Sequence, residues 1–532
     1  PELLTSFADF VRYYGGLDDL VFNGKPFVNH LAHGVRDFFE EGGARCYVMR
    51  VINATDAGGE EVEVYAKKKE DIILPEEKTN EGDPPVEVTI TKSITVQARF
   101  PGAAGNARIT LSLRIKENMF SYKVGPKTDD KTKLEVKQAT LNRVDAGDVV
   151  YIAPTAGKST EPKAKQGLYI VNWDTNDRQF KLDNGSKDEQ GKPVLVKLAD
   201  LVVVPADPKK AKPEAFEVLP VTTEVYIERQ LSDGRFDDPF FLGEFIFGSE
   251  GSDALLAMFS KQPPNRYARL TSPFCFVGVS TTKKEGDDEG VALPYVPTPL
   301  EILRGLFKIT PDKTTGVETL DPDAPVSLKL EGGSDGILPN FSQYAGNEAG
   351  IDDFLAEDDF TKQKNGLLAF EAIPDIHIVA APGYTAWHED PEDALAIGNE
   401  LVKHCEEMKY RIAVLDTPET NLATQALGFR NLRSSEYAAI YYPWIYVADP
   451  RPGHGTQRLK LPPSGFVAGI YARNDVEHAV FKAPANEVVR LAVDFEYRLS
   501  KAHQELLNPN GVNCFRFFEG RGMLLCGART IS

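Results

Sequence analysis

Strand-like and helix-like hydrophobic patterns alternate along the last third of the chain. Residues 376–383 form a short apolar run that is typical of a buried strand, and residues 391–410 repeat apolar side chains at helical spacing. The same patterns predict strands at 411–418 and 437–449, a helix at 424–435, and two terminal strands within 512–531 joined through 519–522. Such alternation predicts parallel strands with helical crossovers.

The first sixty residues predict two helices followed by a strand. Ser6 is suited to cap a helix that stops at the glycine pair 15–16. Segment 25–43 repeats apolar residues four positions apart, which predicts a second helix with one apolar face. Residues 45–52 then alternate apolar and polar side chains, as a strand does.

The middle of the chain is polar and predicts short strands. Residues 86–100 and 107–115 alternate clearly. Residues 128–220 contain runs of strand-forming residues separated by turn signals such as 183–185, so they predict a small inserted β-barrel or sandwich. The four runs are 148–153, 166–173, 178–185 and 193–204, and the charged flanks at 127–133 and 207–214 predict solvated linkers.

Length and charge narrow the class of protein. The chain has 532 residues, which suggests about three to five domains, and its net charge of −19 disfavours direct binding to nucleic acid or anionic membranes. No run approaches the roughly 18–20 apolar residues that span a bilayer, so no membrane insertion is expected. The start lacks the pattern of a signal peptide and an initiator Met, which leaves room for residues before Pro1.

The cysteines predict free thiols. They are few, odd in number and without CxxC spacing, which favours reduced, buried side chains formed in a cytosol over a disulfide framework. Two of them are close enough in sequence to face each other across the terminal hairpin. The five are Cys46, Cys275, Cys405, Cys514 and Cys526.

Candidate metal and catalytic sites are weak. His30 and His33 have a spacing that suits a metal on one helix face, but no third ligand lies nearby in the sequence. The acidic stretch 388–393 and the pairs 352–353 and 358–359 fit helix ends and solvated caps better than Ca²⁺ loops. The sequence contains no phosphate-binding loop, HExxH or GxSxG motif. We therefore predict no catalytic residue, no metal and no cofactor.

The C-terminal motifs resemble those of contractile tail sheath proteins. Residues 461–486 read LPPSGFVAGIYARNDVEHAVFKAPAN, which is similar to the family pattern P-P-S-G-x-x-A-G-x-Y-A-R-x-D followed by K-A-P-A-N. The ending 512–532 resembles the family's terminal hairpin, with Cys526 where Trp is common. Shorter similarities occur at 330–337, at 366–383, at 99–111 and in the first fifty residues. The resemblance is dense only from 366 to 532.

The resemblance implies a fold and a division of the chain. It implies a multidomain α+β and α/β protein whose conserved α/β sheath core is built from N- and C-terminal parts, with mainly-β domains inserted. The predicted parts are 1–60 in the core, 61–127 with 221–365 as a middle α+β domain, 128–220 as an outer decoration, and 366–532 as the inner, tube-facing core. It also implies linking arms beyond both ends of this sequence, which the sequence itself does not contain.

The resemblance also implies a function. Sheath subunits polymerise helically around an inner tube and contract by rigid-body rearrangement, which drives the tube through a target envelope. The implied partners are copies of the chain itself, the inner tube protein, and the baseplate and tail terminator proteins. The implied location is a virion tail or an extracellular contractile particle that is assembled in the bacterial cytoplasm. No nucleotide is needed if the energy is stored at assembly, in agreement with the missing phosphate loop.

Charge suggests which residues contact neighbours. Residues 366–532 carry 16 Lys/Arg and 20 Asp/Glu, so most of the net charge of −19 lies in 1–365. Exposed ion pairs hold weakly, as a releasable tube requires. Four cations in or near the signature segment are the predicted contacts to tube or sheath neighbours: Lys460, Arg473, Lys482 and Arg490. The alternative is pairing within the chain, with Asp475, Glu477 or Glu487.

Two other functions remain open from the sequence. The alternation of strands and helices also suits a cytosolic α/β hydrolase-like enzyme with an inserted β domain, which would use the loop after His377. The insertion 128–220 also suits a receptor-binding module of a surface protein.

Overall fold

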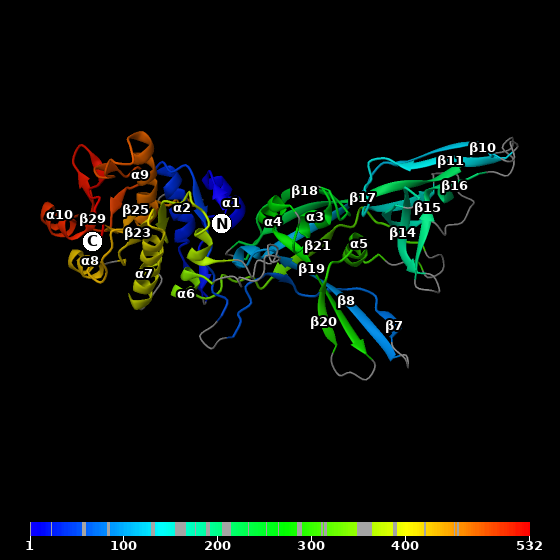
Figure 1. The fold of residues 1–532 in the computed structure, drawn as a ribbon, viewed down its shortest axis with the longest axis horizontal. Coiled ribbons are helices and arrows are strands. Elements are labelled where there is room, and N and C mark those ends of the chain that lie inside the picture. Colours follow the sequence, from blue (N-terminus) through cyan, green and yellow to red (C-terminus); the bar gives the residue numbers. More distant parts are fainter. Residues whose placement is uncertain are drawn as a thin grey trace. The chain divides into compact units, whose positions relative to one another are not determined.

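The architecture is mixed α/β and divides into two compact units. Unit 1 comprises Pro1–Glu63 and Asp335–Ser532, and unit 2 comprises Val64–Ser334. Figure 1 shows unit 1 in dark blue and in yellow to red, and unit 2 in lighter blue to green. The computed structural model describes residues 2–532 except for positions 23, 56–59, 82–85, 129–132, 155–165, 176, 188–191, 205–213, 232–233, 252, 264, 285–289, 310–311, 313–316, 348–363, 387–390, 420–421, 452 and 455–456.

The main sheet of unit 1 is parallel at one side and antiparallel at the other. Its strand order is β22 (Ile378–Ala380), β23 (Ile412–Asp416), β24 (Ala438–Tyr442), β29 (Val512–Phe518), β30 (Gly522–Leu525) and β27 (Glu487–Val488). The first four strands pair in parallel and β29–β30 form a hairpin, so both predictions are confirmed. Helices α7 (Pro391–Met408) and α8 (Ala423–Arg430) make the predicted crossovers.

Both faces of this sheet are covered. Alternate residues of β23 point to opposite faces, as the period of a strand requires. Leu415 packs with residues of α7 and α8 on one face. Val414 packs on the other face with residues of α9 (Ser464–Glu477) and β25 (Ile445–Ala448). Two covered faces explain the continuous apolar runs in these strands.

The run 437–449 was predicted as one strand, and this is wrong. It contains two strands that belong to different sheets, β24 and β25. Pro443 lies between them and has no N–H to continue the first ladder. The second strand pairs instead with β26 (Arg458–Leu461) and β28 (Asp494–Phe495).

The N-terminal elements belong to unit 1. Helix α1 (Phe7–Tyr14) is capped by Ser6 and ends at Gly15, as predicted. The apolar face predicted for α2 (His30–Glu40) is confirmed, since Val35 with Leu31 and Phe39 packs in a hydrophobic cluster, but the rest of that helix is largely buried as well, which was not predicted. One side packs with Phe10 and Val48, and the other contacts α9. The remaining elements of unit 1 are β1 (Glu2–Leu4), β2 (Leu20–Phe22), β3 (Lys25–Phe27), β4 (Cys46–Val48), α6 (Phe341–Ala345) and α10 (Lys501–Leu507).

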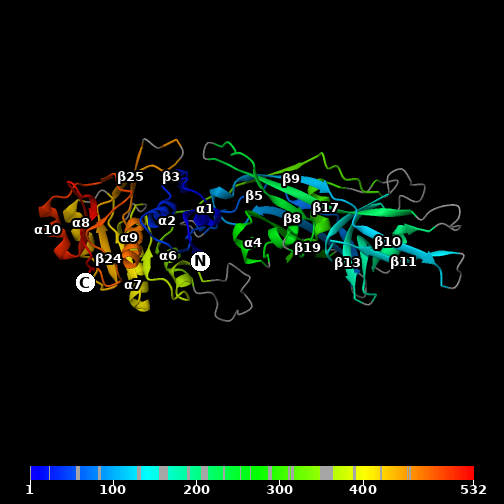
Figure 2. The same ribbon diagram turned by 90° about the horizontal axis from the view of Figure 1, so that it is seen from above.

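Unit 2 is built on a large antiparallel sheet. The predicted strands at 86–100 and 107–115 are confirmed as β8 (Val86–Ala98) and β9 (Ala107–Ile115). Figure 2 shows them with their partners β19 (Phe274–Lys284) and β17 (Glu214–Arg229). The other elements are β5 (Lys67–Lys68), β6 (Ile72–Ile73), β7 (Glu77–Glu81), β18 (Phe240–Ile246), β20 (Val291–Tyr295), β21 (Val326–Glu331), α3 (Leu255–Phe259), α4 (Arg266–Thr271) and α5 (Pro299–Phe307).

The strands within 128–220 contribute most of one hydrophobic cluster, which also contains Phe120, while Val149, Tyr151 and Leu168 belong to the main cluster of unit 2. The strands are β11 (Leu134–Leu141), β12 (Val149–Pro154), β13 (Gly167–Asp174), β14 (Gln179–Lys187), β15 (Pro193–Lys197) and β16 (Val202–Val203). β12 also pairs with β17, so this segment is continuous with the main sheet of unit 2. Whether it acts as a separate domain, and whether the chain has the four predicted parts, stay predictions.

Two local predictions in this segment are wrong. The predicted strand 193–204 is broken by a 3-10 turn at Leu198–Leu201. The predicted turn at 183–185 is an irregularity within β14, where the pairing register shifts. The predicted solvated linker 127–133 lies mostly outside the described residues, and its described residues 127, 128 and 133 are exposed, between β10 (Phe120–Pro126) and its pairing partner β11. The predicted linker 207–214 lies almost wholly outside the described residues.

Two further observations bear on the class of protein. The described part of the chain contains no helix long and apolar enough to cross a membrane. All five cysteines are free thiols, as predicted, and four of them are buried.

Candidate interaction site on helix α9

Helix α9 begins on a buried carboxylate. Asp416 ends β23, and its Oδ1 accepts a hydrogen bond from the Ser464 backbone N–H at 2.8 Å. The Ser464 hydroxyl donates to Oδ2 of the same carboxylate at 2.7 Å. A carboxylate at this position satisfies a free N–H and suits the helix dipole. Burial nevertheless raises the pKa of Asp416 to about 7.

Glycines let α9 pack directly against α2. A Cβ added to Gly465 would lie 2.7 Å from the Cα of Gly34, and one added to Gly469 would lie 2.5 Å from the Phe38 carbonyl oxygen. A Cβ on Gly34 would in turn lie 2.6 Å from Cγ of Pro382. The two helices therefore meet backbone to backbone, and the sequence at these positions requires glycine.

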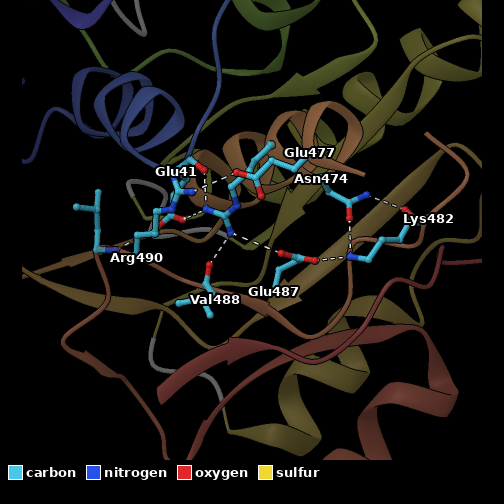
Figure 3. Close-up of polar contacts among 9 residues, drawn as sticks. Glu41, Asn474, Glu477, Lys482, Glu487, Val488 and Arg490 are labelled. Carbon is cyan, nitrogen blue, oxygen red and sulfur yellow. Dashed lines mark hydrogen bonds and ion pairs between the residues drawn. The ribbon is translucent and has the colours of Figure 1, made fainter. Parts of the chain in front are cut away.

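Arg473 holds three segments together. Its Nη1 donates to the carbonyl oxygen of Glu41 at 2.6 Å and to Oε2 of the same residue at 3.0 Å. Its Nη2 donates to the Val488 carbonyl oxygen at 2.7 Å, and the Leu491 N–H donates to Glu41 Oε1 at 3.1 Å. Figure 3 shows Glu41 and Val488 on either side of this network. The Arg473 side chain is 5% exposed and that of Glu41 is 0% exposed.

Burial sets the charge state of this pair. It leaves the pKa of Glu41 raised, although the backbone N–H groups and Arg473 act in the opposite direction. A carboxylate that accepts hydrogen bonds from a guanidinium and a backbone N–H is stabilised in its charged form. The two side chains thus form a buried, hydrogen-bonded ion pair, which makes either partner costly to remove alone.

Lys482 and Arg490 lie at the surface beside Arg473. The Lys482 ammonium donates to Oδ1 of Asn474 at 2.8 Å and pairs with Glu487. Arg490 pairs with Glu477 at 3.5 Å, and both of these side chains are about half exposed. Figure 3 shows both pairs close to the end of α9.

Lys460 lies apart from the other three, on β26. Its ammonium group contacts Glu419 at 2.6 Å and Glu496 at 3.0 Å. All four predicted interaction cations therefore have an acidic partner within unit 1. Pairing with Glu477 and Glu487 follows the alternative drawn from the sequence, whereas Glu41, Glu419 and Glu496 were not identified there. Whether any of the four also contacts another subunit stays a prediction.

A strongly exposed apolar cluster follows these pairs. Val476 at the end of α9 is 82% exposed, Val480 is 81% exposed and Phe481 is 94% exposed. Large apolar side chains gathered at the surface of a folded unit are typical of protein contacts. Sequence reasoning did not separate these three residues from the surrounding motif.

The carboxyl ends of the parallel strands are filled by side chains. This edge is where open α/β sheets commonly bind ligands. Here the Tyr384 hydroxyl donates to the Asp416 carbonyl oxygen at 3.2 Å, and the Trp444 indole N–H donates to the Thr417 carbonyl oxygen at 2.8 Å. All four residues are buried. The enzyme alternative would use the loop after His377, and His377 itself is exposed and contacts Tyr410.

The candidate metal ligands do not form a metal centre within the described residues. His30 and His33 are both buried, and burial lowers the pKa of His30 to about 3 and that of His33 to about 4. No group of three or more His, Cys, Asp or Glu side chains comes together as a metal would require in the part that the structure describes. Positions 388–390 and the acidic pairs 352–353 and 358–359 lie outside the described residues.

Comparison with known proteins places the densest motifs in one family. Residues 362–531 match the family model described as the phage tail sheath protein central domain. Similar solved structures include the helical sheath of the anti-feeding prophage in its contracted state, at 30% identity over 29% of this chain and 42% of that chain, with a TM-score of 0.23.

Two further solved structures are similar. The contracted PVC sheath of an extracellular contractile injection system is 28% identical over 32% of this chain and 44% of that chain, with a TM-score of 0.26. The sheath tail protein Lin1278 from Listeria innocua is 11% identical over 93% of this chain and 71% of that chain, with a TM-score of 0.31. The chain spans 39–44% of the length of the first three injection-system chains that it matches. No curated protein matches it.

Proposed function

From the match of residues 362–531 to the phage tail sheath protein central domain, we propose that the chain is the structural subunit of a contractile sheath. The match to the family model is the observation that carries the proposal. The subunit polymerises helically around an inner tube, and the finished cylinder contracts to drive the tube through a target envelope. Its other partners are the baseplate and the tail terminator.

The work comes from repacking of subunits. A helical polymer needs heterologous contacts, in which unlike surfaces of identical chains meet. The extended cylinder is a metastable packing, and contraction takes each subunit to a second packing by rigid-body rotation. A few kcal/mol per subunit, added over many rings, is the order of free energy that such a switch needs.

The surface near α9 supports a role in subunit contacts. Phe481 and its two exposed valine neighbours form an apolar cluster that suits a lasting contact between subunits, since lasting interfaces are more apolar than transient ones. Lys482 and Arg490 sit in partly exposed polar pairs that suit a weak, releasable contact with the tube, and the proposal includes the less exposed Lys460 as a further contact. Arg473 is buried, and its role in this proposal is to hold the segment that presents the others.

The proposal assigns a place to each part of the chain. Unit 1 is the sheath core, with 366–532 toward the tube, and 128–220 is a decoration on the outer surface. The polymer forms in the bacterial cytoplasm and acts in a tail or an extracellular particle. It binds no nucleic acid directly, inserts in no membrane, uses no cofactor and catalyses no reaction.

Negative-stain microscopy tests this function. The full-length gene product that contains this chain is mixed with the inner tube protein of its own particle. We expect hollow cylinders of two lengths, with the tube inside the longer form. Discrete particles that never polymerise at any protein concentration would contradict the proposal.

A further inference from the structure

Two buried cysteines face each other across the last hairpin. In β29–β30, Phe515 lies opposite Leu525, so the next pair toward the open end is Cys514 opposite Cys526. The Cys526 N–H donates to the Cys514 carbonyl oxygen at 2.7 Å, which confirms this register. Residues directly opposite each other in a sheet place their side chains on the same face.

The spacing of such a pair suits a disulfide. Directly opposite, hydrogen-bonded residues of an antiparallel pair have Cα atoms about 5.5 Å apart, and disulfides span about 4.4–6.8 Å between Cα atoms. Their Cβ atoms are about 4.5–5.5 Å apart, and a disulfide needs about 3.5–4.5 Å, so closure draws the two strands slightly together. A bridge of this kind is easily reduced.

We infer that Cys514 and Cys526 form a cross-strand dithiol that closes to a disulfide when the folded chain meets a small-molecule disulfide such as oxidised glutathione. The inference stands on the hairpin alone and does not depend on the proposed function. Cys405 is also buried and free, but it lies on α7 and has no register partner in the hairpin.

The reaction is two thiol–disulfide exchanges. The Cys526 thiolate attacks one sulfur of the glutathione disulfide, breaks its S–S bond and releases one glutathione thiolate, which takes up a proton. The Cys514 thiolate then attacks the Cys526 sulfur of the mixed disulfide and releases the second glutathione. Two protein thiols are oxidised, and one glutathione disulfide is reduced to two thiols. Cys526 reacts first because it is slightly exposed, whereas Cys514 is fully buried.

Burial makes the closure slow at neutral pH. It raises the pKa of Cys514 to about 12, with the neighbouring Cys526 adding to the effect, and burial also raises the pKa of Cys526. The thiolate is the attacking species, so below the thiol pKa the rate rises about tenfold for each unit by which the pH increases. The pair therefore stays reduced in a reducing cytosol and closes after release into an oxidising medium.

Closure would fix the end of the chain. The segment after Cys526 returns to the main sheet, where the Ile531 N–H donates to the Ala438 carbonyl oxygen at 2.9 Å. If the segment after Cys526 detaches from the sheet, a bridge from Cys526 to β29 limits the detached part to the residues that follow Cys526. We expect the oxidised protein to unfold at a temperature several degrees higher than the reduced protein.

Peptide mapping tests the inference. The folded full chain is incubated with oxidised glutathione at pH 8, acid-quenched, alkylated and digested with trypsin. We expect peptide 502–516 to be linked to peptide 522–529, and the intact mass to fall by two hydrogens. The link should persist in the matched control Cys405→Ser and be lost in Cys514→Ser and in Cys526→Ser.

Any of three results would overturn the inference. The first is that Cys514 and Cys526 are both still alkylated after prolonged oxidation. The second is a glutathione adduct on Cys526 that never resolves, and the third is a bridge from either residue to another cysteine or another molecule. Circular dichroism before and after oxidation shows that the chain stayed folded. If a serine variant does not fold, the map of the unsubstituted protein decides the question.

Discussion

Arg473 and Glu41 are 432 residues apart in the sequence and join in a buried ion pair at 3.0 Å. The contact ties the signature helix α9 to the end of α2, and through Val488 to the segment that follows. The N-terminal helices are therefore part of the same unit as the C-terminal sheet. A subunit that moves as a rigid body needs this kind of internal bond.

Replacing Arg473 by Ala should destabilise unit 1 strongly. The change leaves Glu41 buried without its ion partner, which costs about 3–5 kcal/mol in the free energy of unfolding. Urea unfolding followed by tryptophan fluorescence measures it. The matched control Arg490→Ala removes an exposed pair and should cost about 0–1 kcal/mol. Equal costs for the two variants would contradict the structural role of Arg473.

The helix crossing can be tested with a single methyl group. Gly465→Ala places a Cβ 2.7 Å from the Gly34 Cα and should cost about 1–3 kcal/mol, because backbone must move. Gly428→Ala is the control, since that helical glycine has nothing within 4 Å of an added Cβ. It should stabilise α8 by about 0.5–1 kcal/mol. An unchanged free energy of unfolding for Gly465→Ala would show that α2 and α9 are farther apart than they are in this structure.

Asp148→Asn should stabilise unit 2 at neutral pH. Burial, with the carboxylates of Asp145 and Asp253, raises the pKa of Asp148 from 3.8 to about 6. The folded state therefore binds the proton more tightly than the unfolded state. The wild type loses stability as the pH rises from about 4 to 6, by up to about 3 kcal/mol.

Hydrogen exchange of the β12 and β13 amides measures this effect locally. The Asn variant keeps an oxygen that can accept the Asp145 N–H, a bond of 2.8 Å in the wild type. Its added protection over the wild type should be small near pH 4 and should grow up to pH 7. Added protection that is the same at both pH values would show that Asp148 is not the titrating group.

Phe481→Ser should block polymerisation without unfolding the subunit. The ring is 94% exposed, so its loss removes little from the folded monomer, whereas a contact between subunits would lose an apolar anchor. Sedimentation of the polymer and the melting temperature of the monomer are the two measurements. Tyr267→Ser, at an exposed aromatic of unit 2, is the control and should still polymerise. Normal cylinders from Phe481→Ser would show that the exposed apolar cluster around Phe481 is not a contact between subunits.

Lys482→Glu should loosen the hold on the tube. The variant places a negative charge beside Glu487 and leaves the fold largely unchanged, since the wild-type pair is partly exposed. We expect the tube to leave the sheath at a lower salt concentration than in the wild type. Lys501→Glu reverses another exposed, paired lysine on α10 and should behave as the wild type. An unchanged salt dependence for Lys482→Glu would argue against a tube contact there.

Local patterns predicted the elements, and long-range contacts were beyond their reach. The alternation in β8 and β9 and the periodicity in α7 gave correct elements, since a repeating pattern reports which face is buried. For α2 the pattern found the face that packs with Phe10 and Val48, and it missed the second side, where Gly34 lies against α9. From sequence alone, a glycine within a helix only indicates lower helix propensity, and its packing role becomes clear once the neighbouring helix is known.

For the candidate site, the sequence likewise predicted the local features and missed the contacts between distant segments. The motif around α9 was found from sequence, and so were partners near in the chain, such as Glu487 for Lys482. Glu41 was not found, because no spacing rule links residues 432 positions apart. The exposure of Phe481 was also out of reach, because an apolar residue in an apolar stretch normally indicates a buried position.

Cryo-electron microscopy of one particle before and after contraction tests the central claim most directly. We predict two subunit packings, with more surface buried after contraction, while unit 1 superposes on itself and the Arg473–Glu41 pair stays intact in both. A single packing in both preparations, or a unit 1 that refolds between them, would contradict the account.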